Sequence, residues 1–277
     1  MNLIKSILLL LFLIVSHAHA DQFNLTFKVE GNTIKELDRN ELKEYEKPRD
    51  VTIYEPHEHK KITYIGFDFD NILKRIYGNK LNTGMDLLIK CRDGYQPVIP
   101  FIKFSEYKSY LVYSIRDRDY FTIINIDHNN ETVNLGPYYL IWDNLDNEEL
   151  LKQGSYDFPY QIIEFDLIKF KTRFPKMSPP ENSSEDVKKG FLAFRKYCST
   201  CHTINGEGGE KSVELNYPVS VTEFHSKGWI RSWIKNPASI RYNSRMPAFS
   251  VSGDKKDETI ENIISYLEVM KDYKKLP

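Results

Sequence analysis

The pentapeptide Cys198-Ser199-Thr200-Cys201-His202 indicates how this chain is organised. Its pattern is C-x-x-C-H: two thiols are separated by two residues, and the second thiol is followed directly by an imidazole. A C-x-x-C pair can be half of a zinc site, a redox-active dithiol or, with the adjoining histidine, an attachment site for haem c. In the third case both thiols add to the vinyl groups of one haem, and His202 reaches the iron.

The rest of the chain favours the third interpretation. The 277 residues contain only three cysteines, which are too few for a disulfide framework, and Cys91 is the only one outside the motif. A zinc site would need a second Cys/His pair, and a redox dithiol would need a thioredoxin-like βαβ setting. The motif therefore predicts one covalently attached haem c, held by Cys198 and Cys201, with His202 as an axial ligand of the iron.

Helical patterns flank the motif. Before it, Val187, Gly190, Phe191 and Phe194 recur at positions i, i+3, i+4 and i+7, which is typical of one apolar face of a helix. A second amphipathic pattern closes the chain, and its apolar positions are Ile260, Ile263, Ile264, Leu267 and Met270.

These segments together resemble class I c-type cytochromes. Gly190-Phe191-x-x-Phe194 is similar to the first helix of that family, Arg245-Met246-Pro247-Ala248-Phe249 to its distal methionine segment, and Ile263-Ile264-x-Tyr266-Leu267 to its closing helix. The resemblance implies an all-α cytochrome c domain over residues 185–277, in which the closing helix crosses the first near Gly190. Without a Cβ at that position, two helix backbones can approach closely.

The resemblance also implies that Met246 is the sixth ligand of the iron. A thioether favours ferrous iron and raises the reduction potential. Two alternatives remain open at this stage. His225 could ligate instead, which would lower the potential, or Met246 could be an ordinary core residue.

The N-terminus has the features of an export signal. Lys5 precedes an apolar run, and the stretch ends at Ala18-His19-Ala20, which is similar to a signal-peptidase site. The nine-residue apolar run would span only about 14 Å as a helix, too little for a bilayer. We therefore predict a signal peptide over residues 1–20, a periplasmic location and no transmembrane span in the mature chain; an uncleaved anchor is the alternative.

Residues 21–174 show a different residue pattern from the C-terminal part of the chain. Short runs of β-branched and aromatic residues are separated by turn residues, which predicts an α+β domain with a mixed β-sheet. Short helices are expected at 33–45 and 69–77. The Pro- and Ser-rich stretch 175–184 is typical of a linker between this domain and the cytochrome domain.

The first domain resembles the molybdopterin-binding fold of the sulfite oxidase family. The similar stretches are residues 64–73, 91–97 and 135–142. That family carries its metal-binding cysteine before the Y-x-G segment, and the corresponding residues 51–64 contain no cysteine here. We therefore expect no molybdenum in this domain.

Two further metal sites can be considered in the first domain. Cys91 could be a metal thiolate, although a free cysteine is more often a small buried residue. His57 and His59 would share one face of a strand and could bind a metal, but the neighbouring Lys60 and Lys61 indicate an exposed loop.

The net charge of the chain argues against a nucleic-acid-binding protein. The chain has 38 basic and 39 acidic residues and a net charge of −1, whereas nucleic-acid-binding proteins are usually basic. Residues 227–245 hold five basic and no acidic residues. These groups could pair with haem propionates, steer an acidic redox partner or form a solvated helix face.

The sequence as a whole predicts a periplasmic monohaem cytochrome that transfers single electrons between redox protein partners and is not an enzyme. Two alternatives remain. The haem domain could accept electrons from a fused or partner oxidoreductase, or it could belong to a haem-based sensor or an assembly subunit.

Overall fold

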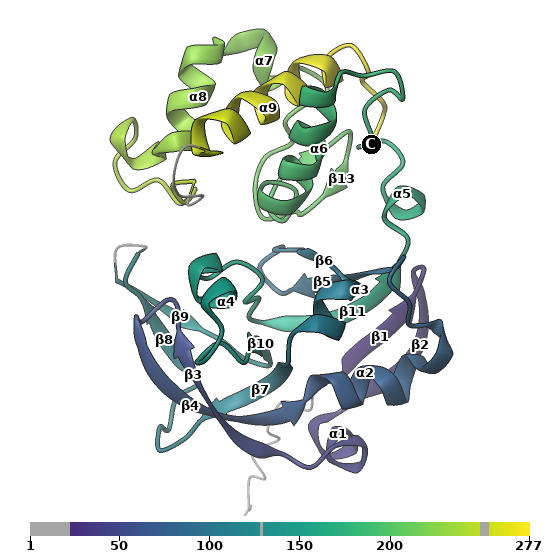
Figure 1. The fold of residues 1–277 in the computed structure, drawn as a ribbon, viewed down its shortest axis with the longest axis vertical. Coiled ribbons are helices and arrows are strands. Elements are labelled where there is room, and N and C mark those ends of the chain that lie inside the picture. Colours follow the sequence, from purple (N-terminus) through teal and green to yellow (C-terminus); the bar gives the residue numbers. More distant parts are fainter. Residues whose placement is uncertain (1–22, 128–129, 250–254) are drawn as a thin grey trace, which may run out of the picture.

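The computed structural model describes residues 23–127, 130–249 and 255–277. The predicted signal peptide at 1–20 lies outside the described residues. Figure 1 shows a first domain built of sheets and short helices and a second, mostly helical domain, with the chain passing between them along one side at α5 (Phe170–Arg173). No helix in the described part of the chain is both long and apolar enough to cross a membrane.

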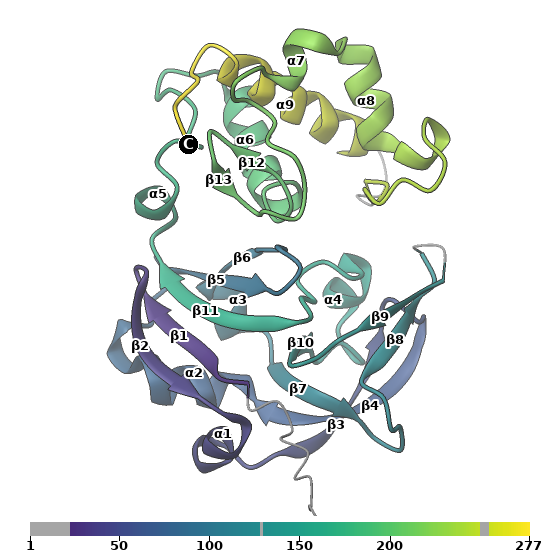
Figure 2. The same cartoon turned by 180° about the vertical axis from the view of Figure 1, so that it is seen from behind.

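A five-stranded sheet forms the side of the first domain nearer the second domain, as Figure 2 shows from behind. Its strands, in spatial order, are β2 (Asn32–Leu37), β1 (Leu25–Val29), β11 (Ile162–Ile168), β5 (Asp86–Cys91) and β6 (Val98–Pro100). Strands β1 and β11 run parallel and the other pairs run antiparallel. The sheet is therefore mixed, which confirms the predicted α+β class of this domain.

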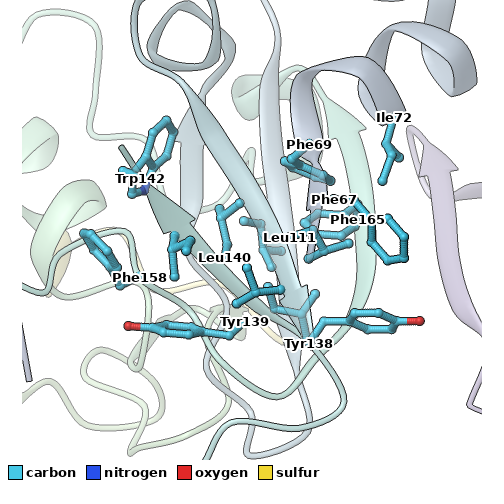
Figure 3. Packing of buried hydrophobic residues seen from close by; sticks show 14 of the residues in the cluster. Phe67, Phe69, Ile72, Leu111, Tyr138, Tyr139, Leu140, Trp142, Phe158 and Phe165 are labelled. Carbon is cyan, nitrogen blue, oxygen red and sulfur yellow. The ribbon is translucent and has the colours of Figure 1, made fainter. Parts of the chain in front are cut away.

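A second sheet packs against the first. It is antiparallel, in the order β10 (Tyr139–Trp142), β7 (Ser109–Ile115), β4 (Lys60–Asp68) and β3 (Arg49–Glu55), and a hairpin of β8 (Thr122–Asn125) and β9 (Glu131–Asn134) adjoins it. Between the sheets lies an aromatic core, in which Phe165 packs against Phe69 (Figure 3). Phe165 also stacks on Phe27. Burial of large rings is the main favourable term for such a core.

The helices of the first domain confirm one expectation and correct another. The predicted helix at 69–77 is α2 (Phe69–Tyr77). The prediction at 33–45 is wrong in its first part, because residues 32–37 pair with β1 as strand β2. Helix α1 (Arg39–Tyr45) begins only after Asp38, whose carboxylate and Glu41 form a capping box. The other helices are α3 (Phe101–Glu106), α4 (Glu148–Gln153) and the single turn η1 (Gly78–Lys80).

The second domain consists of four helices, a helical turn and a short hairpin within the described ranges. The helical elements are α6 (Glu185–Tyr197), α7 (Val221–Phe224), α8 (Lys227–Lys235), η2 (Pro237–Ser239) and α9 (Lys255–Met270). Strands β12 (Thr203–Ile204) and β13 (Glu207–Gly208) pair after the C-x-x-C-H motif, so the expected all-α domain is corrected to a mostly helical one. The hairpin arises because Asn205 and Gly206 both take positive φ and turn the chain back.

Helices α6 and α9 cross at Gly190. A Cβ at this position would lie 1.8 Å from the backbone oxygen of Asn262 and 3.0 Å from the Cβ of Tyr266. The crossing therefore requires glycine, and it fixes the start of the C-x-x-C-H motif relative to the end of the chain.

Candidate haem-binding site

The C-x-x-C-H motif forms a compact turn at the C-terminal end of α6. Cys198 is the C-cap residue, and its carbonyl accepts hydrogen bonds from the backbone N–H groups of Cys201 (3.0 Å) and His202 (2.9 Å). Cys198 and Cys201 are free thiols. Burial raises the pKa of Cys198 to about 12 and raises that of Cys201, so both are protonated thiols at neutral pH. The turn brings together the three groups that the motif predicts.

The ring of His202 is oriented by a backbone carbonyl. Its Nδ1 lies 2.8 Å from the oxygen of Val213. A carbonyl can only accept, so Nδ1 carries the proton and Nε2 keeps its lone pair. Burial also lowers the pKa of His202, which favours the neutral imidazole. A neutral imidazole with a hydrogen bond on its other nitrogen is the form that binds a metal.

The loop that supplies the Val213 carbonyl is held by one carboxylate. Glu214 accepts hydrogen bonds from the backbone N–H groups of Asn205 (2.9 Å), Gly206 (2.9 Å), Asn216 (2.7 Å) and Tyr217 (3.0 Å). Although partial burial opposes ionisation, these hydrogen bonds leave the pKa of Glu214 below its ordinary value. The orientation of His202 thus depends on an ionised Glu214.

A pair of buried asparagines ties this loop to the end of the chain. The side-chain amide of Asn216 donates to Asn205 Oδ1 (2.9 Å) and to the carbonyl of Met270 (2.8 Å). Asn205 in turn donates to the carbonyls of Lys176 and Tyr273. The end of α9 therefore supports the loop beside the motif.

Met246 lies on a loop beyond α8. Its Sδ accepts a hydrogen bond from Nε1 of Trp233 at 3.1 Å, and both Met246 and Cys198 pack against the main apolar cluster of this domain. A thioether has two lone pairs, so the hydrogen bond to Trp233 leaves one for a metal. The donor set of two thiols, an oriented imidazole and a thioether fits haem c.

His225 lies at the C-terminal end of α7, beside the tryptophans of α8. Its ring stacks on Trp229 with centroids 3.6 Å apart, and Trp229 stacks on Trp233 at 5.0 Å. His225 is thus one end of an aromatic row whose other end donates to Met246 Sδ. These half-buried rings also show that the tryptophans of residues 227–245 lie at the edge of the core.

The basic stretch is largely paired within the domain. Lys227 forms an ion pair with Glu268 (2.6 Å) and Lys235 with Asp257 (2.7 Å). Arg231 forms a bidentate ion pair with Glu261. All three acidic partners lie on α9. Much of the positive charge is therefore neutralised locally, which weakens the expectation that this stretch steers a partner.

The two histidines of the first domain that the sequence suggested as metal ligands each contact a carboxylate. His57 and His59 lie in the turn between β3 and β4, where the Nδ1 of His57 contacts buried Glu55 (2.7 Å) and His59 contacts Asp127 (3.0 Å). They do not share a strand face, because His59 takes a positive φ that turns the chain. His57 is also buried, contrary to the exposed loop that its neighbours indicate.

Cys91 is 5% exposed, and burial raises the pKa of its thiol well above the ordinary value. It is therefore a small buried residue in the apolar core of the first domain, as free cysteines often are. In the part of the chain that the structure describes, no three His, Cys, Asp or Glu side chains are grouped so as to hold a metal ion.

The sequence did not indicate three groups that contribute to the site: the Val213 carbonyl, Glu214 and the indole of Trp233. A carbonyl has no sequence signature, and Glu214 belongs to no spacing pattern. The two tryptophans in the basic stretch were visible, but their alignment with Met246 depends on how α8 packs.

Comparison with known proteins agrees with the second domain. Residues 185–267 match the family model described as cytochrome C oxidase, cbb3-type, subunit III. The match supports a C-terminal class I c-type cytochrome, and a cytochrome c domain transfers electrons by haem. It covers less than half of the chain and does not include the first domain. No curated protein matches the chain.

Proposed function

We propose that this chain is an exported monohaem c-type cytochrome that passes single electrons between redox proteins in the periplasm. One observation carries the proposal: beside two free thiols, His202 is held by Val213 with its Nε2 available to a metal. The family match over residues 185–267 supports the same conclusion.

Two residues of the site would attach the haem, and two others would ligate its iron. Cys198 and Cys201 would hold the haem through thioether bonds, and His202 Nε2 and Met246 Sδ would occupy the two axial positions. The bound haem supplies one-electron chemistry. The hydrogen bonds from His202 to Val213 and from Trp233 to Met246 would hold both ligands in place in either oxidation state.

Haem staining of the denatured full-length protein tests this proposal. The wild-type protein should retain the stain, because thioether bonds survive denaturation. The double variant Cys198→Ala/Cys201→Ala should lose it completely, whereas the control Cys91→Ala should keep it. Stain retained by the double variant, or absent from the wild-type protein, would refute covalent attachment at this motif.

A further inference from the structure

A turn of the first domain completes the hydrogen bonding of the C-x-x-C-H motif. This segment, which we call the turn 93–96, follows strand β5. The backbone N–H of Gln96 donates to the carbonyl of Thr200 (2.8 Å), which lies between the two cysteines. The backbone N–H of Glu210 donates to the carbonyl of Gly94 (2.9 Å). The main chains of the two domains are therefore joined at the attachment motif.

An ion pair closes the same contact. Lys211 Nζ lies 2.5 Å from Asp93 Oδ2, with both side chains partly exposed. The ammonium also lies 5.5 Å and 5.7 Å from the ring centroids of Tyr95 and Tyr160 in the first domain. Cation–π contacts of this kind favour one position for the lysine over its other rotamers.

A second attachment fixes the helix that leads to the motif. Arg195 of α6 bonds to Asp86 of β5 at 2.5 Å, and its guanidinium lies 3.8 Å from the centroid of Phe170. Leu88 and Ile168 of the first domain are fully buried in the same apolar cluster as the helices of the second domain. With two separate attachments, the domains cannot easily rotate about either one.

We propose that the turn 93–96 is part of the haem site. It clamps the attachment motif, limits the access of water to this motif and thereby raises the reduction potential of the haem. The inference rests on the proposed function. Ferric haem carries one more positive charge than ferrous haem, so a surround that excludes water disfavours the ferric state. The first domain thus raises the reduction potential of the haem domain in the same chain.

Two matched glycines test the clamp in the full-length protein. Gly94 and Gly31 have φ values of +84° and +81°, so alanine strains the backbone similarly at both. A Cβ at Gly94 would lie 2.9 Å from the backbone of Glu210 and Lys211, whereas at Gly31 it would meet nothing within 4 Å. Gly94→Ala should lower the midpoint potential in an equilibrium redox titration and enlarge the radius of gyration in X-ray scattering. Gly31→Ala should leave both at wild-type values.

A charge swap provides an independent test. Asp93→Lys places two like charges together and should open the contact. The added positive charge would by itself raise the midpoint potential, so a fall can come only from opening of the clamp. Adding Lys211→Asp in the double variant should restore both the potential and the radius of gyration.

These outcomes separate the clamp from the proposed function. A full-length protein without covalent haem contradicts the proposed function before any variant is compared. A haem-loaded Gly94→Ala protein whose potential equals that of Gly31→Ala would overturn the clamp and leave the cytochrome assignment intact. An Asp93→Lys protein whose potential rises or stays unchanged would overturn it too.

Discussion

At the scale of single residues, the two proposed axial ligands are positioned by unlike neighbours. A fixed carbonyl orients His202, and its burial keeps the imidazole neutral. Met246 is held through its sulfur by an indole N–H on the adjacent helix. Both neighbours contact the atom or ring that we propose as a ligand, so each acts directly on the site.

Met246→Ala should open the sixth coordination position. The reduced protein should then bind carbon monoxide while the haem stays attached, and the oxidised protein should lose the weak near-infrared band of iron–thioether bonding. Met246→His should stay low-spin with a lower potential, because imidazole favours the ferric state more than a thioether does. His225→Ala is the control and should keep the wild-type spectrum. If His225→Ala changes the spectrum and Met246→Ala does not, His225 is the ligand.

At the scale of elements, the crossing of α6 and α9 organises the second domain. Gly190→Ala should destabilise the domain by about 3 kcal/mol or more, because the new methyl group overlaps the backbone of Asn262. Gly228→Ala in α8 is the matched control, since its Cβ would meet nothing within 4 Å. Helix propensity alone would make both changes neutral or stabilising by up to about 1 kcal/mol. Chemical denaturation followed at the haem absorption band measures both, and equal midpoints would contradict the close crossing.

The loop held by Glu214 is the second element on which the site depends. Glu214→Gln should cost about 1–2 kcal/mol at neutral pH, because an amide cannot accept all four backbone hydrogen bonds. Since folding lowers the pKa of Glu214, its contribution is full above the ordinary value of 4.5 and is lost as the pH falls through the lower folded value.

The pH dependence of this difference can be measured by denaturation at several pH values. The wild-type protein and Glu214→Gln should differ at pH 7 and converge in acid. The exposed Glu181→Gln provides the control and should stay within about 0.5 kcal/mol of the wild-type protein throughout. A difference that persists unchanged in acid would show that the variant acts through packing.

At the scale of the whole molecule, we propose that the first domain is a scaffold without a catalytic metal. Elemental analysis of the purified full-length protein should find one iron and no stoichiometric molybdenum per chain. Cys91 is buried in the apolar core of the first domain, and residues 51–64 supply no thiol for molybdenum. Stoichiometric molybdenum, or reduction of the haem by sulfite, would instead favour an oxidoreductase that delivers electrons to its own haem domain.

The fold class of each domain could be predicted from the sequence, but the arrangement of the two domains relative to each other could not. Strand and helix periodicities distinguish the first domain from the second because they depend on neighbours along the chain. The contact between the turn 93–96 and Thr200 joins residues about a hundred positions apart through main-chain atoms, which every residue type carries. The first part of the prediction at 33–45 is wrong because main-chain pairing of β2 with the neighbouring strand β1 overrode the helical pattern.

The order of residues along the chain is enough to predict haem c, since Cys198, Cys201 and His202 are neighbours and have the spacing of its attachment motif. The resemblance to class I c-type cytochromes also predicted that α6 and α9 cross near Gly190. The tautomer of His202, the contact that holds Met246 and the surface that covers the motif follow from the folded structure instead. Those features depend on carbonyls, indole N–H groups and buried carboxylates that come together only when distant segments pack, because a hydrogen bond requires its partners within about 3 Å.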